Sequence, residues 1–192
     1  MKKWLAALGL VAALASSSLA APTRWTIDPA HSTADFAVTH LEISDVEGTF
    51  TKITGSATID DADLSKSHVT ASIDMSSVDT GIQMRDDDLK SNDFFNVPAY
   101  PTMTFQSTKI WKTGDATAKM TGNLTLHGIT KEVTFDVKLP TPPAAADRRT
   151  AEATTTISRK SFAVGPDSTL IGDDVSITLE IQLVKSPATP AH

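Results

Sequence analysis

The sequence predicts an all-β fold, a single antiparallel sandwich or closed barrel of about eight strands. Three observations support this. The chain is rich in Thr, Val and Ile, which favour strands. Apolar and polar residues alternate with a period of two in most segments, which gives each strand one apolar and one polar face. Short turn signals, such as His127-Gly128 and Thr113-Gly114-Asp115, separate neighbouring segments, and no internal linker marks a second domain.

The first twenty residues differ from the rest of the chain. Lys2 and Lys3 precede an apolar run over 4–14, and small residues follow up to Ala20. This order predicts a secretory signal peptide over 1–20. The apolar run is too short to span a bilayer comfortably, and no other long uncharged apolar segment follows. An integral helical membrane protein is therefore excluded.

The alternation defines the expected strands in chain order. They lie near 24–28, 33–39, 48–59, 69–75, 102–106, 120–126, 133–139, 149–157 and 175–183. The last of them has the longest pattern, because every second residue from Val175 to Leu183 is apolar while Ser176, Thr178 and Glu180 lie between them. The polar set is expected to face water and the apolar set the interior.

Three segments interrupt the strand pattern. Residues 82–95 place apolar side chains, Leu89 among them, between charged ones, which predicts a short helix that ends before Pro98. The stretch 140–146 is rich in Pro and Ala and is expected to be a surface loop. The tail 186–192 is expected to be disordered.

Composition excludes several classes of function. The chain has no Cys, which excludes a disulfide scaffold, a lipid-modified Cys anchor, Cys-ligated zinc and thiol catalysis. Its 17 basic and 23 acidic residues give a net charge of −6, and removal of Lys2 and Lys3 with the signal peptide would make it more negative. A nucleic-acid partner is not expected.

Catalytic and metal motifs are weak. The five His residues form no HExxH pair, and the chain has no GxSxG turn. The segment 60–66 superficially resembles a calcium loop, but Lys66 stands where the sharp turn needs Gly, so a solvated turn is expected. The three Asp residues over 86–88 fit the acidic first turn of a helix. No catalytic or metal-ligating residue is predicted.

The apolar interior is the remaining feature that could carry a function. An eight-stranded barrel can be filled by side chains or can hold one small ligand. Many inward positions are small or medium-sized, among them Ala34, Ala71, Val133 and Val175. A packed core and a ligand pocket both fit this composition. An outer-membrane barrel fits less well, because few aromatic residues are available for two interfacial girdles.

Several segments resemble one protein family. They are WTIDPAHS from Trp25 with FAVTH from Phe36, then RD at Arg85, LKS at Leu89, DFFN at Asp93, YP at Tyr100 and TF at Thr104, then GNLTLHGITK from Gly122, SRKSF from Ser158 and IGDDV from Ile171. This set, in this order, resembles the YceI-like family of periplasmic polyisoprenoid-binding proteins. The chain differs from the usual family pattern at Asp88, where His is frequent, and at Ala163, where Gly is frequent.

The resemblance implies a lipocalin-like antiparallel barrel over 21–185 with a long internal pocket for an isoprenoid chain, as in a quinone or a polyprenyl lipid. It also implies a periplasmic binding or carrier protein with no catalytic step and no cofactor, in transient contact with a membrane. Two alternatives stay open. One is a hydrolase or isomerase acting on an amphiphile, which requires His31 or His40 to meet an Asp at the pocket mouth. The other is a stress-related interaction protein with a filled core.

Strand parity and the predicted helix together define the candidate ligand-binding residues. They are Phe36, Val38, Ile73, Met75, Met84, Arg85, Leu89, Phe94, Phe105, Leu124, Leu126, Phe135, Val137, Phe162, Ile177, Leu179 and Ile181. The helical segment is the expected rim of the pocket, where Arg85 could donate hydrogen bonds to a quinone carbonyl or a phosphate. The alternative for Arg85 is an ion pair with a carboxylate, such as those over 86–88, that fixes the loop.

Overall fold

The computed structural model describes residues 21–40, 44–139 and 147–187. The predicted signal peptide, the predicted loop over 140–146 and most of the predicted tail lie outside these ranges. The described residues form eleven strands, one α-helix and four short 3-10 helices. The strands are β1 Thr23–Ile27, β2 Thr33–His40, β3 Ser44–Phe50, β4 Ile53–Ile59, β5 His68–Asp74, β6 Val78–Asp79, β7 Thr102–Lys112, β8 Thr117–Leu126, β9 Ile129–Lys138, β10 Arg148–Ser158 and β11 Ile171–Lys185. The helices are α1 Gln83–Lys90, η1 Pro29–His31, η2 Leu64–Lys66, η3 Met75–Ser77 and η4 Lys160–Phe162.

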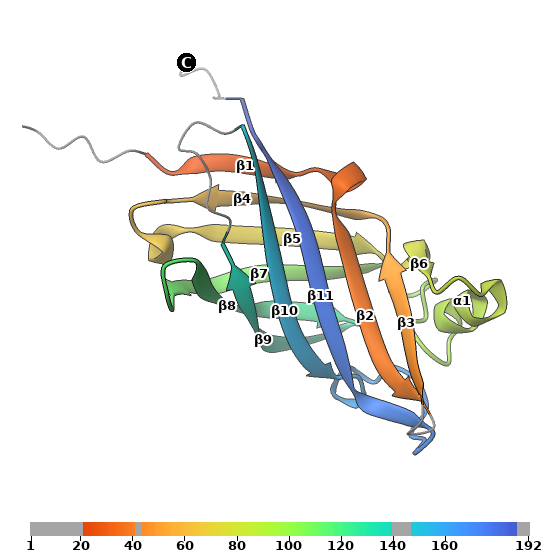
Figure 1. The fold of residues 1–192 in the computed structure, drawn as a ribbon. Coiled ribbons are helices and arrows are strands. Elements are labelled where there is room, and N and C mark those ends of the chain that lie inside the picture. Colours follow the sequence, from red (N-terminus) through yellow and green to blue (C-terminus); the bar gives the residue numbers. More distant parts are fainter. Residues whose placement is uncertain (1–20, 41–43, 140–146, 188–192) are drawn as a thin grey trace, which may run out of the picture.

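Eight of the strands close into an antiparallel barrel, in the order β1-β4-β5-β7-β8-β9-β10-β11 (Figure 1). The ring closes where β11 pairs with β1, with Ile27 opposite Leu183. The strands β2, β3 and β6 extend the same sheet from β11. Residues 28–32, which include η1, connect β1 to β2, and two residues connect β3 to β4. At each of these short connections the chain bends and goes on from one strand into the next. The predicted antiparallel barrel of about eight strands is confirmed.

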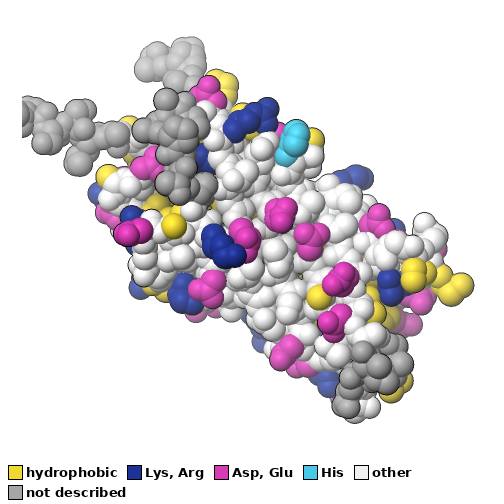
Figure 2. All heavy atoms as spheres, in the orientation of Figure 1, with side chains coloured by type: hydrophobic (Ala, Val, Ile, Leu, Met, Phe, Trp, Pro, Cys, Tyr) yellow, Lys and Arg dark blue, Asp and Glu magenta, His cyan; other side chains and the backbone are white. Residues whose placement is uncertain are grey.

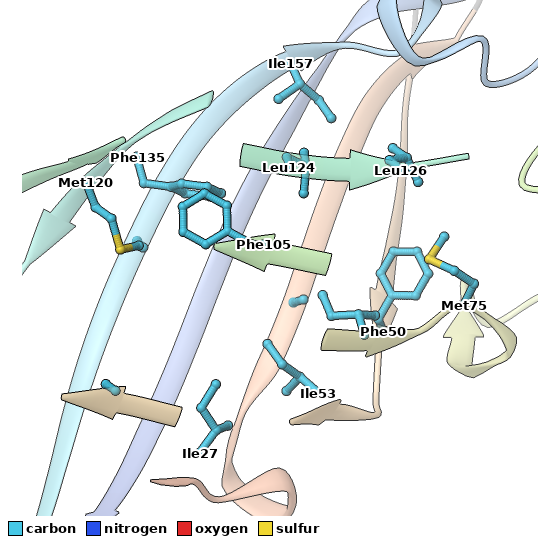
Figure 3. Packing of buried hydrophobic residues seen from close by; sticks show 14 of the residues in the cluster. Ile27, Phe50, Ile53, Met75, Phe105, Met120, Leu124, Leu126, Phe135 and Ile157 are labelled. Carbon is cyan, nitrogen blue, oxygen red and sulfur yellow. The ribbon is translucent and has the colours of Figure 1, made fainter. Parts of the chain in front are cut away.

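Alternation along each strand separates the interior from the outer surface. On β8, Ala118, Met120, Leu124 and Leu126 are buried. In the middle of the barrel the rings of Phe105 and Phe135 meet edge to face, with their centroids 5.3 Å apart (Figure 3). Edge-to-face contact is a favoured arrangement of aromatic rings and fixes two large side chains of the core against each other.

The outer face carries polar and charged pairs between neighbouring strands. The hydroxyls of Thr121 and Thr134 lie 2.7 Å apart, and Lys119 Nζ donates to Asp136 Oδ1 at 2.7 Å. Acidic side chains are spread over the surface of β10, β11, β2 and β3 (Figure 2). Among the described residues, no helix is long and apolar enough to cross a membrane.

The helix is shorter than the segment 82–95 suggests, since α1 ends at Lys90. The backbone N–H groups that follow turn back onto the last helical carbonyls: Phe95 N donates to Leu89 O and Val97 N to Lys90 O. Asn96 adopts a positive φ of 46°, which completes the tight turn. Residues 91–95 therefore form a turn instead of a further helical turn.

A buried arginine organises the segment between β10 and β11. Arg159 is only 4% exposed. Its guanidinium donates to backbone carbonyls that follow it in the chain, those of Val164, Pro166, Ser168, Ile171 and Gly172. One side chain thus supplies the hydrogen bonds that fold this segment over the end of the barrel.

Ala163 occupies a backbone conformation that favours glycine. It ends η4 with φ 53° and ψ 37°, in the left-handed region where a Cβ atom costs about 1 kcal/mol. This explains why Gly is frequent here in the resembled family. We expect Ala163→Gly to raise the free energy of unfolding by about 0.5–1 kcal/mol in urea titrations. In contrast, Ala116→Gly, in an exposed turn without positive φ, should lower it, and equal effects at both sites would contradict the explanation.

Candidate functional site

The barrel encloses a long apolar cavity of about 430 Å³. Its wall consists mainly of the inward-facing residues of the strands, and the turn after α1 adds Phe94 and Phe95. On β10 the wall runs from Arg149 to Ile157, a length of roughly 26 Å at the usual rise of a strand. The cavity therefore extends along most of the barrel, with an elongated apolar shape.

Most of the predicted binding residues line this cavity. They are Phe36, Val38, Ile73, Met75, Leu89, Phe94, Phe105, Leu124, Leu126, Phe135, Val137, Ile177, Leu179 and Ile181. Ile177, Leu179 and Ile181 belong to the inner face of β11 yet are only half-buried, because part of their surface faces the cavity. Whether they contact a ligand stays a prediction.

Three of the predicted residues do not line the cavity. Met84 is 77% exposed on the outer side of α1. Phe162, the last residue of η4, is fully buried in the hydrophobic core but is not part of the cavity wall. Arg85 is likewise absent from the wall, and its contact with a ligand stays a prediction.

Arg85 fixes its own loop through a threonine. Its Nε donates to Thr80 Oγ1 and its Nη2 to Thr80 O, both at 2.8 Å. The buried carboxylate of Asp86 accepts from the backbone N–H and the hydroxyl of the same Thr80, at 2.9 and 2.6 Å. The alternative to ligand contact was an ion pair of Arg85 with a carboxylate. The structure instead places Thr80 between the two charged groups, and both hold the entry to α1.

Four charged residues of the cavity wall lie at the opposite end of the barrel from α1. Asp61 follows β4, Lys112 ends β7, Asp115 lies in the next turn and Arg149 is the second residue of β10. None of these four residues is among the predicted binding residues. The alternation of inward and outward side chains could have identified two of them. Lys112 and Arg149 continue the inward-facing series of their strands past the last apolar residue.

Two residues hold the guanidinium of Arg149. Its Nη1 and Nη2 donate to the two carboxylate oxygens of Asp61 at 2.7 and 2.8 Å. The guanidinium lies 4.5 Å from the centroid of the Trp25 ring, in a cation–π contact. The hydrogen bonds between them lower the pKa of Asp61 and raise the pKa of Arg149, so both groups are charged over the physiological range.

Two donors at this end have no acceptor. Arg149 Nε and Trp25 Nε1 are both buried, and neither has a hydrogen-bond partner within the described part of the chain. Most buried polar groups in proteins are paired, so an unpaired donor needs an explanation. Arg159, at the other end of the cavity, differs because its N–H groups already donate to carbonyls.

The histidine pairs in the structure lie outside the cavity wall. His31 Nδ1 is 3.0 Å from Asp28 Oδ2, but this pair lies on the outer surface beside η1. His68 Nδ1 is 3.2 Å from Ser107 Oγ, which also accepts from Val69 N and is buried away from the cavity. The side chain of His40 is outside the described part of the structure.

The acidic turn after β4 is held by its own hydrogen bonds. Asp60 Oδ1 accepts from the backbone N–H groups of Ala62 and Asp63. Across 21–40, 44–139 and 147–187, no three His, Asp or Glu side chains converge in a metal-ligating arrangement.

Comparison with known proteins identifies relatives over nearly the whole chain. The family model of the YceI-like domain matches residues 25–183. A UPF0312 protein of Pseudomonas paraeruginosa is 36% identical over 190 residues, which covers 96% of this chain and 99% of the relative. A UPF0312 protein of Pseudomonas putida is 36% identical over 186 residues, with coverage of 94% and 97%.

Solved structures share the fold. BcnA of Burkholderia cenocepacia superposes with a TM-score of 0.76 at 27% identity, covering 81% of this chain and 98% of that one. The YCEI protein of Campylobacter jejuni gives 0.69 at 29% identity, with coverage of 78% and 90%. A polyisoprenoid binding domain from Saccharophagus degradans gives 0.65 at 16% identity, with coverage of 84% and 98%, and shows likeness of fold alone. From the family match and the relatives above 30% identity, this chain belongs to the YceI-like family.

Proposed function

We propose that this protein binds an isoprenoid-type lipid, such as a quinone or a polyprenyl lipid, inside the barrel and carries it through the periplasm without a catalytic step. The observation that carries the proposal is the long apolar cavity of about 430 Å³. Burying an apolar chain there would contribute about 25 cal/mol per Å² of surface removed from water, before the cost of association. An elongated shape suits a chain better than a compact ring system.

Family membership supports a binding role. A structural neighbour is named as a polyisoprenoid binding domain, and its barrel superposes on this one. The location rests on the sequence of residues 1–20, which has the order of a secretory signal peptide.

Membrane contact is part of the proposal. Ile82 and Met84, beside and on α1, are 52% and 77% exposed. Hydrophobic side chains project from the α1 end of the molecule in Figure 2. Two exposed apolar side chains beside the turn that lines the cavity would suit a brief encounter with a lipid surface.

The open cavity argues against the filled-core alternative. A scaffold protein would gain stability from filling this space with side chains, because an empty cavity costs dispersion contacts. The enzymatic alternative required a His with an Asp at the pocket mouth. The pair of His31 and Asp28 lies outside the cavity wall, so binding is the function that the geometry favours.

The test uses native protein isolated from the periplasmic fraction of expressing cells. We expect an intact mass that corresponds to a chain beginning at Ala21, and an organic extract in which mass spectrometry finds an intact isoprenoid lipid. A folded protein without extractable lipid would favour the scaffold alternative. Conversion of the lipid to a different compound would favour an enzyme, and retention of residues 1–20 would overturn the periplasmic assignment.

A further inference from the structure

We propose that the Arg149 end of the cavity holds the polar head of the lipid, and that it selects an uncharged head with a hydrogen-bond acceptor over a phosphate. This inference rests on the proposed function. It also moves the head from the α1 end, where Arg85 suggested it, to the opposite end of the barrel.

The two ends of the cavity differ in what they offer a polar group. At the α1 end the wall includes Leu89, Phe94, Phe95 and the buried Arg159, whose N–H groups all donate to backbone carbonyls. An amphiphile with its head there would lose hydration without gaining a donor. At the other end the wall includes Arg149, which keeps a buried N–H unpaired within the described part of the chain.

An acceptor on the ligand would satisfy this donor. Arg149 Nε is buried and carries a hydrogen that nothing in the described structure accepts. The neighbouring Trp25 Nε1, in the ring that stacks on this guanidinium, is in the same condition. Because Trp25 is not part of the cavity wall, Arg149 Nε is the donor that a head could reach, and a head that only donates would leave it unsatisfied. A carbonyl oxygen would accept from Arg149 and remove the cost of its unpaired N–H.

The charges at this end disfavour a phosphate. The bidentate pair with Asp61 occupies the end-on fork of Arg149, which is formed by its two terminal nitrogens, so a phosphate would compete with Asp61 for that fork. Asp61 and Asp115 also balance Lys112 and Arg149, so the formal charges of these four wall residues at this end sum to zero. A phosphate would have to displace Asp61 or lie beside two carboxylates. A neutral acceptor meets neither obstacle.

The experiment compares three probes that share a geranylgeranyl chain and end in a methyl ketone, a monophosphate or no polar head. Each is titrated into delipidated, folded wild-type protein. We expect the ketone to bind about tenfold or more tightly than either other probe, the effect of one hydrogen bond from a charged donor.

Three variants separate the contributions. Arg149→Lys keeps a positive charge opposite Asp61 but removes the Nε–H, and should reduce the preference for the ketone over the headless chain to about one. Asp61→Asn keeps the shape, releases the guanidinium and removes a negative charge, and should strengthen monophosphate binding about tenfold. Arg148→Lys is the matched control, because Arg148 lies on the outer surface, paired with Asp28 and Gln182, and should leave all three affinities unchanged.

The outcomes distinguish this inference from the function on which it rests. Equal binding of all three probes, monophosphate binding as tight as that of the ketone, or an intact ketone preference in Arg149→Lys would each overturn the head assignment while leaving chain binding in place. If none of the probes binds the folded protein, the proposed function fails, and the head assignment fails with it.

Discussion

Replacing Phe105 with Glu is expected to abolish lipid retention. Phe105 is 9% exposed, lines the cavity and meets Phe135 in the middle of the barrel. A carboxylate there has no partner among the apolar residues around it, so either the charge is buried at a cost of several kcal/mol or water enters the cavity. Both results remove the apolar path for the chain. We expect affinity to fall by about a hundredfold or more, measured as co-purified lipid and as binding of added lipid.

A second variant tests the same prediction in case Phe105→Glu does not fold. Leu179→Glu places the charge on the half-buried inner face of β11, where the cavity leaves more room than the position of Phe105. Its matched control is Thr178→Glu, one residue earlier on the outer face of the same strand. Thermal melts recorded alongside the binding data identify the folded variants. Full lipid occupancy in folded Leu179→Glu would contradict an internal binding site, whereas loss of lipid in Thr178→Glu alone would place the ligand outside the barrel.

The barrel could be predicted because its physical cause is local. A strand with one face inside and one outside must alternate with a period of two, and the turns at 113–116 and 127–128 carry residues suited to tight reversals. The end of α1 was harder to place. It depends on backbone hydrogen bonds after Lys90 and on a positive φ at Asn96, whereas the pattern of apolar residues continues to Phe94 and Phe95.

The cavity wall could also be predicted in large part, because parity alone places residues such as Leu124 and Ile177 inside. The polar end could not. Asp61, Lys112 and Arg149 are far apart in the sequence, and only closure of the barrel brings them to one end. Arg85 was predicted to bind the head of the ligand because it lies beside apolar residues in a segment that carries several family motifs. Its partner Thr80 is a neutral residue close by in the chain, which charge patterning does not reveal.

The second large effect is expected at Arg159, where substitution by Ala should lower the free energy of unfolding by about 2–4 kcal/mol. This buried guanidinium donates to carbonyls between Val164 and Gly172 at 2.8 to 3.4 Å. Truncation leaves those carbonyls without their donor, and some of them stay shielded from water. Urea titration measures the change. The control is Lys160→Ala, since Lys160 is exposed and contacts Asp167 in a surface pair that contributes little to stability.

Arg159→Lys shows whether the number of donors or the charge holds this end of the barrel. A lysine keeps the charge, but its single ammonium cannot spread over the carbonyls that the planar guanidinium reaches. We therefore expect it to lose most of the stability that Arg159→Ala loses. Because Val164 and Ile171 from the same segment line the cavity, both variants should also release bound lipid faster than the wild type. If the lysine variant matched the wild type in stability and lipid release, a positive charge alone would be sufficient to hold the segment between β10 and β11. The hydrogen bonds to this set of carbonyls would then not be what keeps that segment in place.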